Sequence, residues 1–184
     1  SKYLAGHNDV VCGLAVARES ELAERIGFLQ NALGTILGPQ DSWLLLRGLK
    51  TLALRMERHN SNAQRVAEWL CQHPKVSHVN YPGLSEHPGH RIQAGQAEGH
   101  GGMLSFQVTE AELVPQVLQK VQMLRFAESL GGVESLITFP AVQTHADIPA
   151  AVREKLGITD RLLRLSVGIE HPDDIIEDLE QALE

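Results

Sequence analysis

The sequence is poor in cysteine and aromatic residues and has no long apolar run, and each shortage excludes a class of protein. Its 184 residues contain two cysteines, Cys12 and Cys71, and begin with no secretory leader pattern. A disulfide framework is therefore not expected, and a reducing, cytoplasmic compartment is favoured. No apolar stretch reaches the roughly 20 residues that a membrane-spanning helix needs, so no membrane partner is expected. Four Phe, two Trp and two Tyr predict a mainly aliphatic core.

An excess of positive charge is also missing. Lys and Arg number 16 against 23 Asp and Glu, which gives a net charge of −7. Proteins that bind nucleic acid gather basic residues on one face, so this class is not expected. The one basic cluster, Arg47, Lys50, Arg55 and Arg58, alternates with leucines at helical spacing. That pattern predicts the polar side of a helix.

Metal-ligand spacing is absent as well, although the chain has nine histidines. His87, His90 and His100 are the closest group, but there is no HExxH pattern and no pair of neighbouring cysteines. Pro88 and Gly89 favour a turn at HPGH. No metal site is expected.

Hydrophobic periodicity predicts strands and helices that alternate along the chain, with no internal repeat. This order is typical of an α/β or α+β architecture. Strands are predicted over 10–17, 76–81, 103–108, 124–127, 136–139 and 161–167. Helices are predicted over 19–37, from 41 to about 70 with a bend at Gly48, over 91–97, over 110–121 with Pro115 in the first turn, and from Pro172 to the end.

Three segments combine glycine or proline with polar residues that packing does not require. They are SKYLAGHND at 1–9, AESLGGVESLITFPAVQTHADIP at 127–149 and LLRLSVGIE at 162–170. Lys2 lies among small and polar residues, which suits a pocket, although most terminal lysines are solvated and inert. Arg164 lies between leucines on a predicted strand. Its guanidinium fits a carboxylate bidentately, so Arg164 is a candidate for holding an amino acid, with an internal ion pair as the alternative.

These segments together resemble the Cys/Met-metabolism family of pyridoxal-phosphate enzymes, which contains cystathionine synthases, cystathionine lyases and O-acylhomoserine sulfhydrylases. The resemblance covers the whole chain because further motifs of the family follow in order. They are LLLRGLKTLALRM at 44–56, YPGL at 81–84, HPGH at 87–90 and GGMLSF at 101–106.

The resemblance implies a fold type I architecture, like that of aspartate aminotransferase, and identifies the chain as the carboxyl-terminal half. Residues 1–48 are then the tail of the large cofactor domain. Residues 49–184 are a small α/β domain with an antiparallel sheet covered by helices. The family also implies a homotetramer, a dimer of tight dimers with active sites at the dimer interface.

The resemblance further implies the roles of five residues. Lys2 forms the internal Schiff base with pyridoxal phosphate and then moves protons between substrate carbons. Ser1 contacts the cofactor phosphate. Ser129 and Arg164 hold the substrate α-carboxylate, which fixes the Cα–H bond over the cofactor ring. Glu128 binds the distal ammonium of a cystathionine-like molecule.

Two positions favour one activity within the family. An acid at Glu128 resembles the enzymes that act at the γ-carbon, whereas enteric β-lyases carry an aromatic residue there. Gln143 in QTHADIP replaces a methionine common in the lyases and resembles bacillus-type γ-synthases that also act as O-acetylhomoserine thiolyases. The sequence therefore predicts γ-replacement on an O-acylhomoserine by cysteine, giving cystathionine. The alternatives are a γ-lyase or β-lyase.

A prediction of another class stays open. In the family, an upstream half supplies the stacking aromatic, the partner of the pyridine nitrogen and the phosphate loop. A chain without that half would act only in assembly, as a folded domain that catalyses nothing by itself.

Overall fold

The computed structural model describes all 184 residues, which divide into two compact units, 1–52 and 53–184. The predicted boundary after residue 48 falls inside helix α2 (Pro39–Leu49). The observed boundary falls at the start of helix α3 (Leu52–Gln72). That the first unit is the tail of a cofactor domain stays a prediction.

The first unit holds two helices, α1 (Ser20–Leu33) and α2. Helix α1 ends before its predicted limit because Gly34 adopts φ 69°, a left-handed conformation that closes a helix. Gly38 and Pro39 then begin α2, with proline at a position where its missing N–H costs nothing. The small core of the unit consists of Ala5, Val10 and Leu45, with four partly buried neighbours.

The predicted strand over 10–17 is wrong. These residues form no strand, and Val11 and Val16 are 91% and 96% exposed. A strand needs a neighbour that accepts and donates its backbone hydrogen bonds. The first unit contains no strand, so the β-branched, apolar residues here have no ladder to join.

The long helix predicted from residue 41 is interrupted two to three residues after the predicted bend. The break lies between α2 and α3, where the Thr51 N–H reaches the Gly48 carbonyl at 3.3 Å. Gly48 itself lies against the backbone of Ala5. A Cβ at Gly48 would stand 2.1 Å from the Ala5 carbonyl oxygen, so only glycine permits this contact.

The second unit is built on a five-stranded sheet of order β1-β2-β5-β4-β3. Every neighbouring pair is antiparallel except β3 and β4, which are parallel. The expected antiparallel sheet is thus corrected to a mixed one, because β3 and β4 are joined by a loop that returns the chain to the same end. The strands are β1 (Val76–Asn80), β2 (Met103–Val108), β3 (Arg125–Phe126), β4 (Leu136–Thr138) and β5 (Leu162–Ser166).

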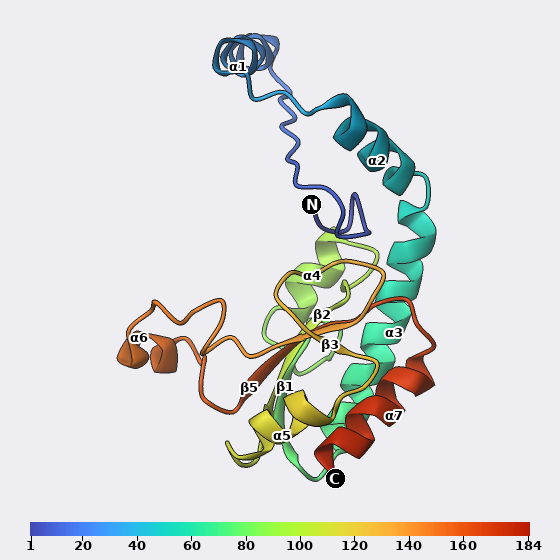
Figure 1. Ribbon diagram of the computed structural model, residues 1–184, viewed down its shortest axis with the longest axis vertical. Helices are drawn as coiled ribbons and strands as arrows, with labels where there is room; N and C mark the ends of the chain where they lie inside the picture. Colours follow the sequence, from blue (N-terminus) through green and yellow to red (C-terminus); the bar gives the residue numbers. More distant parts are fainter. The chain divides into compact units, whose positions relative to one another are not determined.

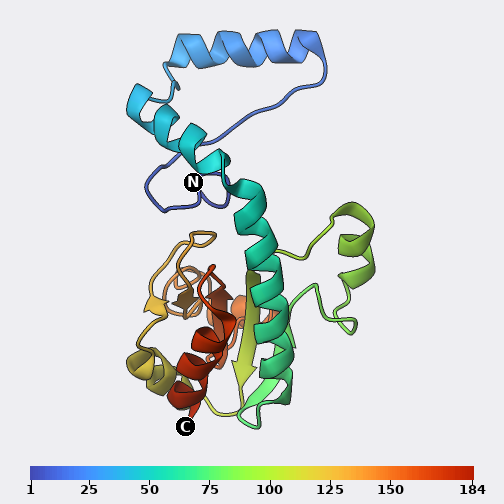
Figure 2. The same ribbon diagram turned by 90° about the vertical axis from the view of Figure 1, so that its right-hand side faces the viewer.

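Helices cover one face of this sheet. Helices α3 and α7 (Pro172–Leu183) lie side by side on it in both views, and α5 (Leu113–Lys120) contacts α7 (Figures 1 and 2). Alternate residues of β2, together with Leu163 and Leu165 of β5, point into this core and are almost fully buried. Pro115 lies in the first turn of α5 and Pro172 begins α7, as predicted.

Two shorter helices lie outside this core. Helix α4 is His90–Gln96, close to its prediction, and α6 is Ala150–Lys155, which the sequence analysis missed. The chain around α6 leaves the sheet on the side opposite α3 and α7 (Figure 1). None of the helices combines the length and the hydropathy that a membrane span requires.

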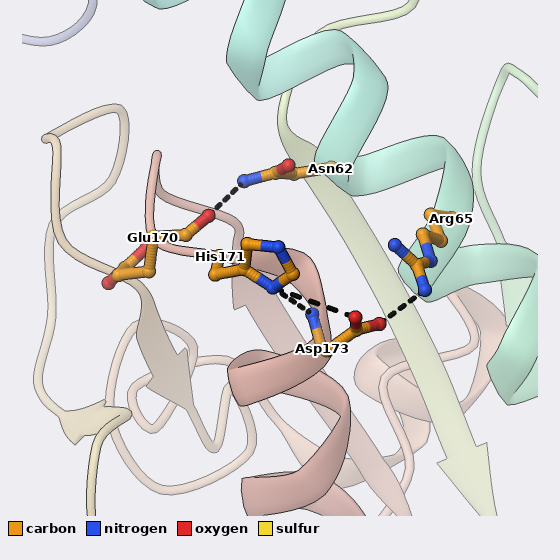
Figure 3. Close-up of polar contacts among 5 residues, drawn as sticks. All are labelled: Asn62, Arg65, Glu170, His171 and Asp173. Atoms are coloured by element: carbon orange, nitrogen blue, oxygen red, sulfur yellow. Dashed lines mark hydrogen bonds and ion pairs between the residues drawn. The ribbon is translucent and has the colours of Figure 1, made fainter.

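Side-chain hydrogen bonds to backbone groups hold the connections in place. The buried Asp178 carboxylate on α7 accepts the N–H groups of Gln122, Met123 and Leu124 at 2.8–3.0 Å. On α3, Asn62 donates to the Glu170 carbonyl at 2.8 Å, and Arg65 pairs with Asp173 (Figure 3). These bonds fix the segment between β5 and α7 against α3.

Candidate active site

Lys2 lies in the first unit at the start of a tight turn. The Gly6 N–H donates to the Lys2 carbonyl at 2.7 Å, and Gly6 adopts φ 81°, which favours glycine. The Lys2 side chain is exposed. The backbone of the predicted nucleophile is therefore fixed while its amine is accessible.

Ser1 is bound to the extended segment of the same unit. Its hydroxyl accepts the Cys12 N–H at 2.8 Å and donates to the Cys12 carbonyl at 3.0 Å. A serine has one O–H donor. Contact with a phosphate, as the resemblance implies, requires that donor to turn away from Cys12.

Arg164 lies in the second unit within a polar row that crosses the helix-free face of the sheet. The register places Asn80, Ser105, Arg164 and Thr138 side by side on β1, β2, β5 and β4. Arg164 Nη2 donates to Thr138 Oγ1 and to the Ser129 carbonyl, both at 3.2 Å. Its buried Nε has no hydrogen-bond partner. A half-buried guanidinium with an unused N–H is suited to an anion.

Burial lowers the pKa of the Arg164 guanidinium, and the charge of Glu128 acts in the opposite direction. Arginine remains protonated in proteins, so the group keeps its positive charge. The internal ion pair weighed in the sequence analysis is not formed, because no carboxylate lies within ion-pair distance of Arg164. The three predicted substrate-binding residues are nevertheless neighbours in space.

Ser129 has a strained backbone, with φ 88°. A residue with a Cβ rarely adopts this conformation, and such positions cluster at functional sites. The loop is held by Gly131, whose N–H donates to Ser166 Oγ at 2.8 Å, and by Thr138, which donates to the Ala127 carbonyl at 2.9 Å. These contacts keep the Ser129 carbonyl directed at the guanidinium.

Behind the loop, Ser135 and Glu170 form a second support. The Glu170 carboxylate accepts the Ser135 N–H at 2.6 Å and its hydroxyl at 2.9 Å. Gly168 donates to the same hydroxyl at 2.9 Å, and a Cβ at Gly168 would stand 2.3 Å from the Val133 carbonyl. The two later segments that the sequence analysis selected are thus bound to each other.

A pocket of about 290 Å³ lies beside Arg164 on the same face of the sheet. Its lining is mainly apolar, with polar groups at Asn80, Ser105, His145 and Arg164. Gln143, which departs from the lyase pattern, accepts the Phe139 N–H at 2.8 Å and so closes the turn that leads into this lining. An apolar pocket with a few polar groups is typical of a small-molecule site.

Comparison with known proteins identifies the family of the chain. Residues 1–184 match the family described as Cys/Met metabolism PLP-dependent enzyme. The chain belongs to this family. The sequence is 55% identical to a cystathionine β-lyase of Lactococcus lactis subsp. cremoris and 53% identical to a cystathionine γ-lyase of Bacillus subtilis, in each case over the whole chain and 48% of the relative.

The fold is also that of the family. A crystal structure of cystathionine γ-synthase from Xanthomonas oryzae pv. oryzae in complex with cystathionine matches 99% of the chain with a TM-score of 0.94 and 46% identity. The chain spans about half the length of these relatives, 47% of that structure and 48% of the two lyases. Fold type I and pyridoxal phosphate dependence are confirmed, while the share being the carboxyl-terminal one stays a prediction.

The residues present fit the cofactor chemically. Lys2 supplies an exposed primary amine, which is the group that condenses with the cofactor aldehyde. Ser1 supplies a hydroxyl that two hydrogen bonds hold against the Cys12 backbone. No group of three or more His, Cys, Asp or Glu residues is arranged to hold a metal ion.

Sequence reasoning missed two features. Arg55 was placed on a polar helix face, but it is 4% exposed, and burial lowers its pKa. Thr138, fully buried between Arg164 and the Ala127 carbonyl, was seen only as a strand residue. The signal that could have identified Thr138 is the pairing of the two predicted strands, which places it opposite Arg164.

Proposed function

We propose that this chain carries half of the active site of an enzyme that forms cystathionine by γ-replacement, with an O-acylhomoserine and cysteine as substrates. The observation that carries the proposal is the group formed by the Arg164 guanidinium, the Ser129 carbonyl and the nearby charge of Glu128. Cystathionine has an α-carboxylate and a distal ammonium at separate points of the molecule, which match a cation and an anion that lie near each other without forming an ion pair.

Each residue has a defined task in this proposal. Arg164 binds the α-carboxylate through N–H groups that include the unpartnered Nε, and so orients the substrate Cα–H bond. Glu128, which is exposed, attracts the distal ammonium. Lys2 and Ser1 would hold the cofactor, and Lys2 Nζ would then carry a proton between substrate carbons. The cofactor, when bound, stores the electron pair left by the broken Cα–H bond.

A lyase that cleaves cystathionine is the second candidate, and the names of the relatives at 55% and 53% identity favour it. The same carboxylate and ammonium contacts serve cleavage, because the substrate of the lyase is the product of the synthase. The two activities differ in the fate of the carbon skeleton and not in the groups that Arg164 and Glu128 recognise.

Product analysis on the full-length protein separates the candidates. O-acetylhomoserine or O-succinylhomoserine with cysteine should give cystathionine, with kcat/KM above that for cystathionine cleavage. Release of cysteine and 2-oxobutyrate from cystathionine as the faster reaction would assign a γ-lyase. Homocysteine and pyruvate as the faster products would assign a β-lyase. Sulfide in place of cysteine measures thiolyase activity in the same assay.

We further propose a cytoplasmic homotetramer built from dimers that share active sites. The family resemblance supports this assembly. Light scattering coupled to size-exclusion chromatography of the full-length protein should give the mass of four chains, and a monomer that is active at high dilution would contradict shared sites.

A further inference from the structure

We propose that Thr138 is a positioning residue that fixes the Arg164 guanidinium and the loop before Ser129 for recognition of an amino-acid carboxylate. This inference rests on the proposed function only in assigning the carboxylate to Arg164. No sequence motif assigns a role to Thr138, which is the last residue of the short, apolar strand β4.

One hydroxyl joins the two parts of the carboxylate site. Thr138 Oγ1 accepts Arg164 Nη2–H at 3.2 Å and donates its own hydrogen to the Ala127 carbonyl at 2.9 Å. The same Nη2 reaches the Ser129 carbonyl at 3.2 Å. The guanidinium is thus attached to the loop at Ser129 directly and at Ala127 through Thr138.

The hydroxyl is held with little freedom. Thr138 is 1% exposed, and its backbone lies opposite Arg164 in the antiparallel register of β4 and β5. A β-branched side chain on a strand has few accessible χ1 rotamers. Because its donor and one acceptor site are both used within the protein, the hydroxyl orients its neighbours and does not itself contact substrate.

Loss of the hydroxyl would leave the guanidinium attached at one point. In Thr138→Val the shape of the side chain is kept, but Arg164 loses one hydrogen bond and the half-buried Ala127 carbonyl loses this donor. The guanidinium can then rotate about its last bonds. Binding of a carboxylate should weaken by about tenfold or more, the effect of a hydrogen bond to a charged group. Thr138→Ser keeps the hydroxyl and should stay within about threefold of the wild type.

The test measures binding and not turnover. L-Alanine and ethylamine are titrated into the full-length protein loaded with pyridoxal phosphate, and each dissociation constant is read from the change in cofactor absorbance. Both probes carry an amine, but only L-alanine carries a carboxylate. Thr138→Val should raise the dissociation constant of L-alanine and leave that of ethylamine unchanged. Thr109→Val, the same change at the residue that follows β2, is the control and should alter neither.

Several results would overturn the inference. They are equal weakening of both probes, no weakening of L-alanine by Thr138→Val, or a Thr138→Ser variant as weak as Thr138→Val. If Thr138→Val does not fold, Thr138→Ala is titrated in its place with the same expectations. A protein that processes neither O-acylhomoserine nor cystathionine, yet shows the selective loss for L-alanine, would refute the proposed function and support Thr138.

Discussion

The two units of the chain differ in how much of their apolar surface they bury. In the second unit, nineteen apolar residues from the sheet, from α3, α5 and α7 and from the adjoining connections form one buried cluster. In the first unit, only three residues form such a cluster. Helix α1 has no buried residue, and even its apolar Phe28 and Leu33 are 71% and 72% exposed. Apolar burial is the main favourable term in folding. The second unit therefore carries its own core, whereas the first depends on few internal contacts.

The candidate residues are divided between these two differently packed units. Lys2 and Ser1 belong to the sparsely packed unit, and Glu128, Ser129 and Arg164 belong to the packed one. A reactive amine gains from accessibility, while a carboxylate site gains from groups fixed by packing. The predictions below use this contrast, beginning with the change expected to have the largest effect.

Removing the Lys2 amine should abolish chemistry and leave the fold intact. Lys2→Ala in the full-length protein should lower kcat by about 10³-fold or more, because both the imine-forming group and the proton carrier are lost. Borohydride reduction should attach the cofactor to the wild-type peptide that contains Lys2 and not to the variant, as read by mass spectrometry. Lys50→Ala, at another exposed lysine of the same unit, is the control. A variant that retains activity would refute the role of Lys2.

The same experiment on the isolated 184-residue chain addresses the non-catalytic alternative. A chromophore that depends on Lys2 in this chain would mean that the residues present suffice to bind the cofactor. Its absence here, with its presence in the full-length protein, would support a purely structural role for the isolated chain.

Removing the Arg164 guanidinium should affect substrate and not cofactor. Arg164→Ala should lower kcat/KM by about 10- to 100-fold, since hydrogen bonds to charged groups contribute about 1.5–3 kcal/mol. The absorbance of the bound cofactor should stay unchanged. Arg161→Ala, just before the same strand, removes an arginine whose guanidinium donates to the Thr109 carbonyl at 3.3 Å and should have little effect on kcat/KM. If Arg164→Ala fails to fold while Arg161→Ala folds, Arg164 has a structural role instead.

Sequence patterns predicted the two helices of the first unit and the strands of the second unit, but the strand predicted in the first unit is absent. The strand predicted over 103–108 is confirmed as β2, and its alternate residues enter a core. The equally apolar run at 10–17 formed no strand, because strand formation depends on a partner that local sequence cannot supply. The parallel pairing of β3 with β4 likewise depends on how a loop returns, which periodicity does not encode.

The candidate site was predictable in its residue types and not in its geometry. Arg164 was selected because a charge between leucines needs a partner, and the structure gives it the Ser129 carbonyl. The strain at Ser129 and the link through Thr138 depend on tertiary contacts between β4, β5 and the loop. Such contacts join residues far apart in sequence, so no local pattern predicts them.

Two glycine substitutions in the first unit should have opposite effects. Gly48→Ala places a Cβ against the Ala5 carbonyl and should lower the free energy of unfolding by about 1–3 kcal/mol. Gly27→Ala, in the middle of α1 with nothing within 4 Å of its Cβ, should raise it by about 1 kcal/mol or less. Calorimetry on the two variants checks both signs. Equal effects would mean that the contact with Ala5 contributes nothing to stability.

A buried histidine should make the stability of the second unit depend on pH. His59 on α3 is fully buried, and its Nδ1 lies 2.7 Å from the Val167 carbonyl oxygen. Burial lowers the pKa of His59, and the charge of Arg55 lowers it further, while the bond to Val167 and the charge of Glu170 raise it. Burial is the largest of these effects, so the folded state binds a proton less readily than the unfolded state.

The sign of the effect follows from this difference. The stability that neutral His59 contributes to the folded state is fully present above the pKa of an unfolded histidine, about 6.5. It is lost as the pH falls from there through the lower pKa of His59 in the folded state. The slope contributed by one proton is at most about 1.4 kcal/mol per pH unit. Urea midpoints between pH 8 and pH 5 should therefore decline in the wild type. The decline should be smaller in His59→Gln and unchanged in His78→Gln, whose histidine is exposed on β1. An equal decline in both variants would place the titrating group elsewhere in the protein.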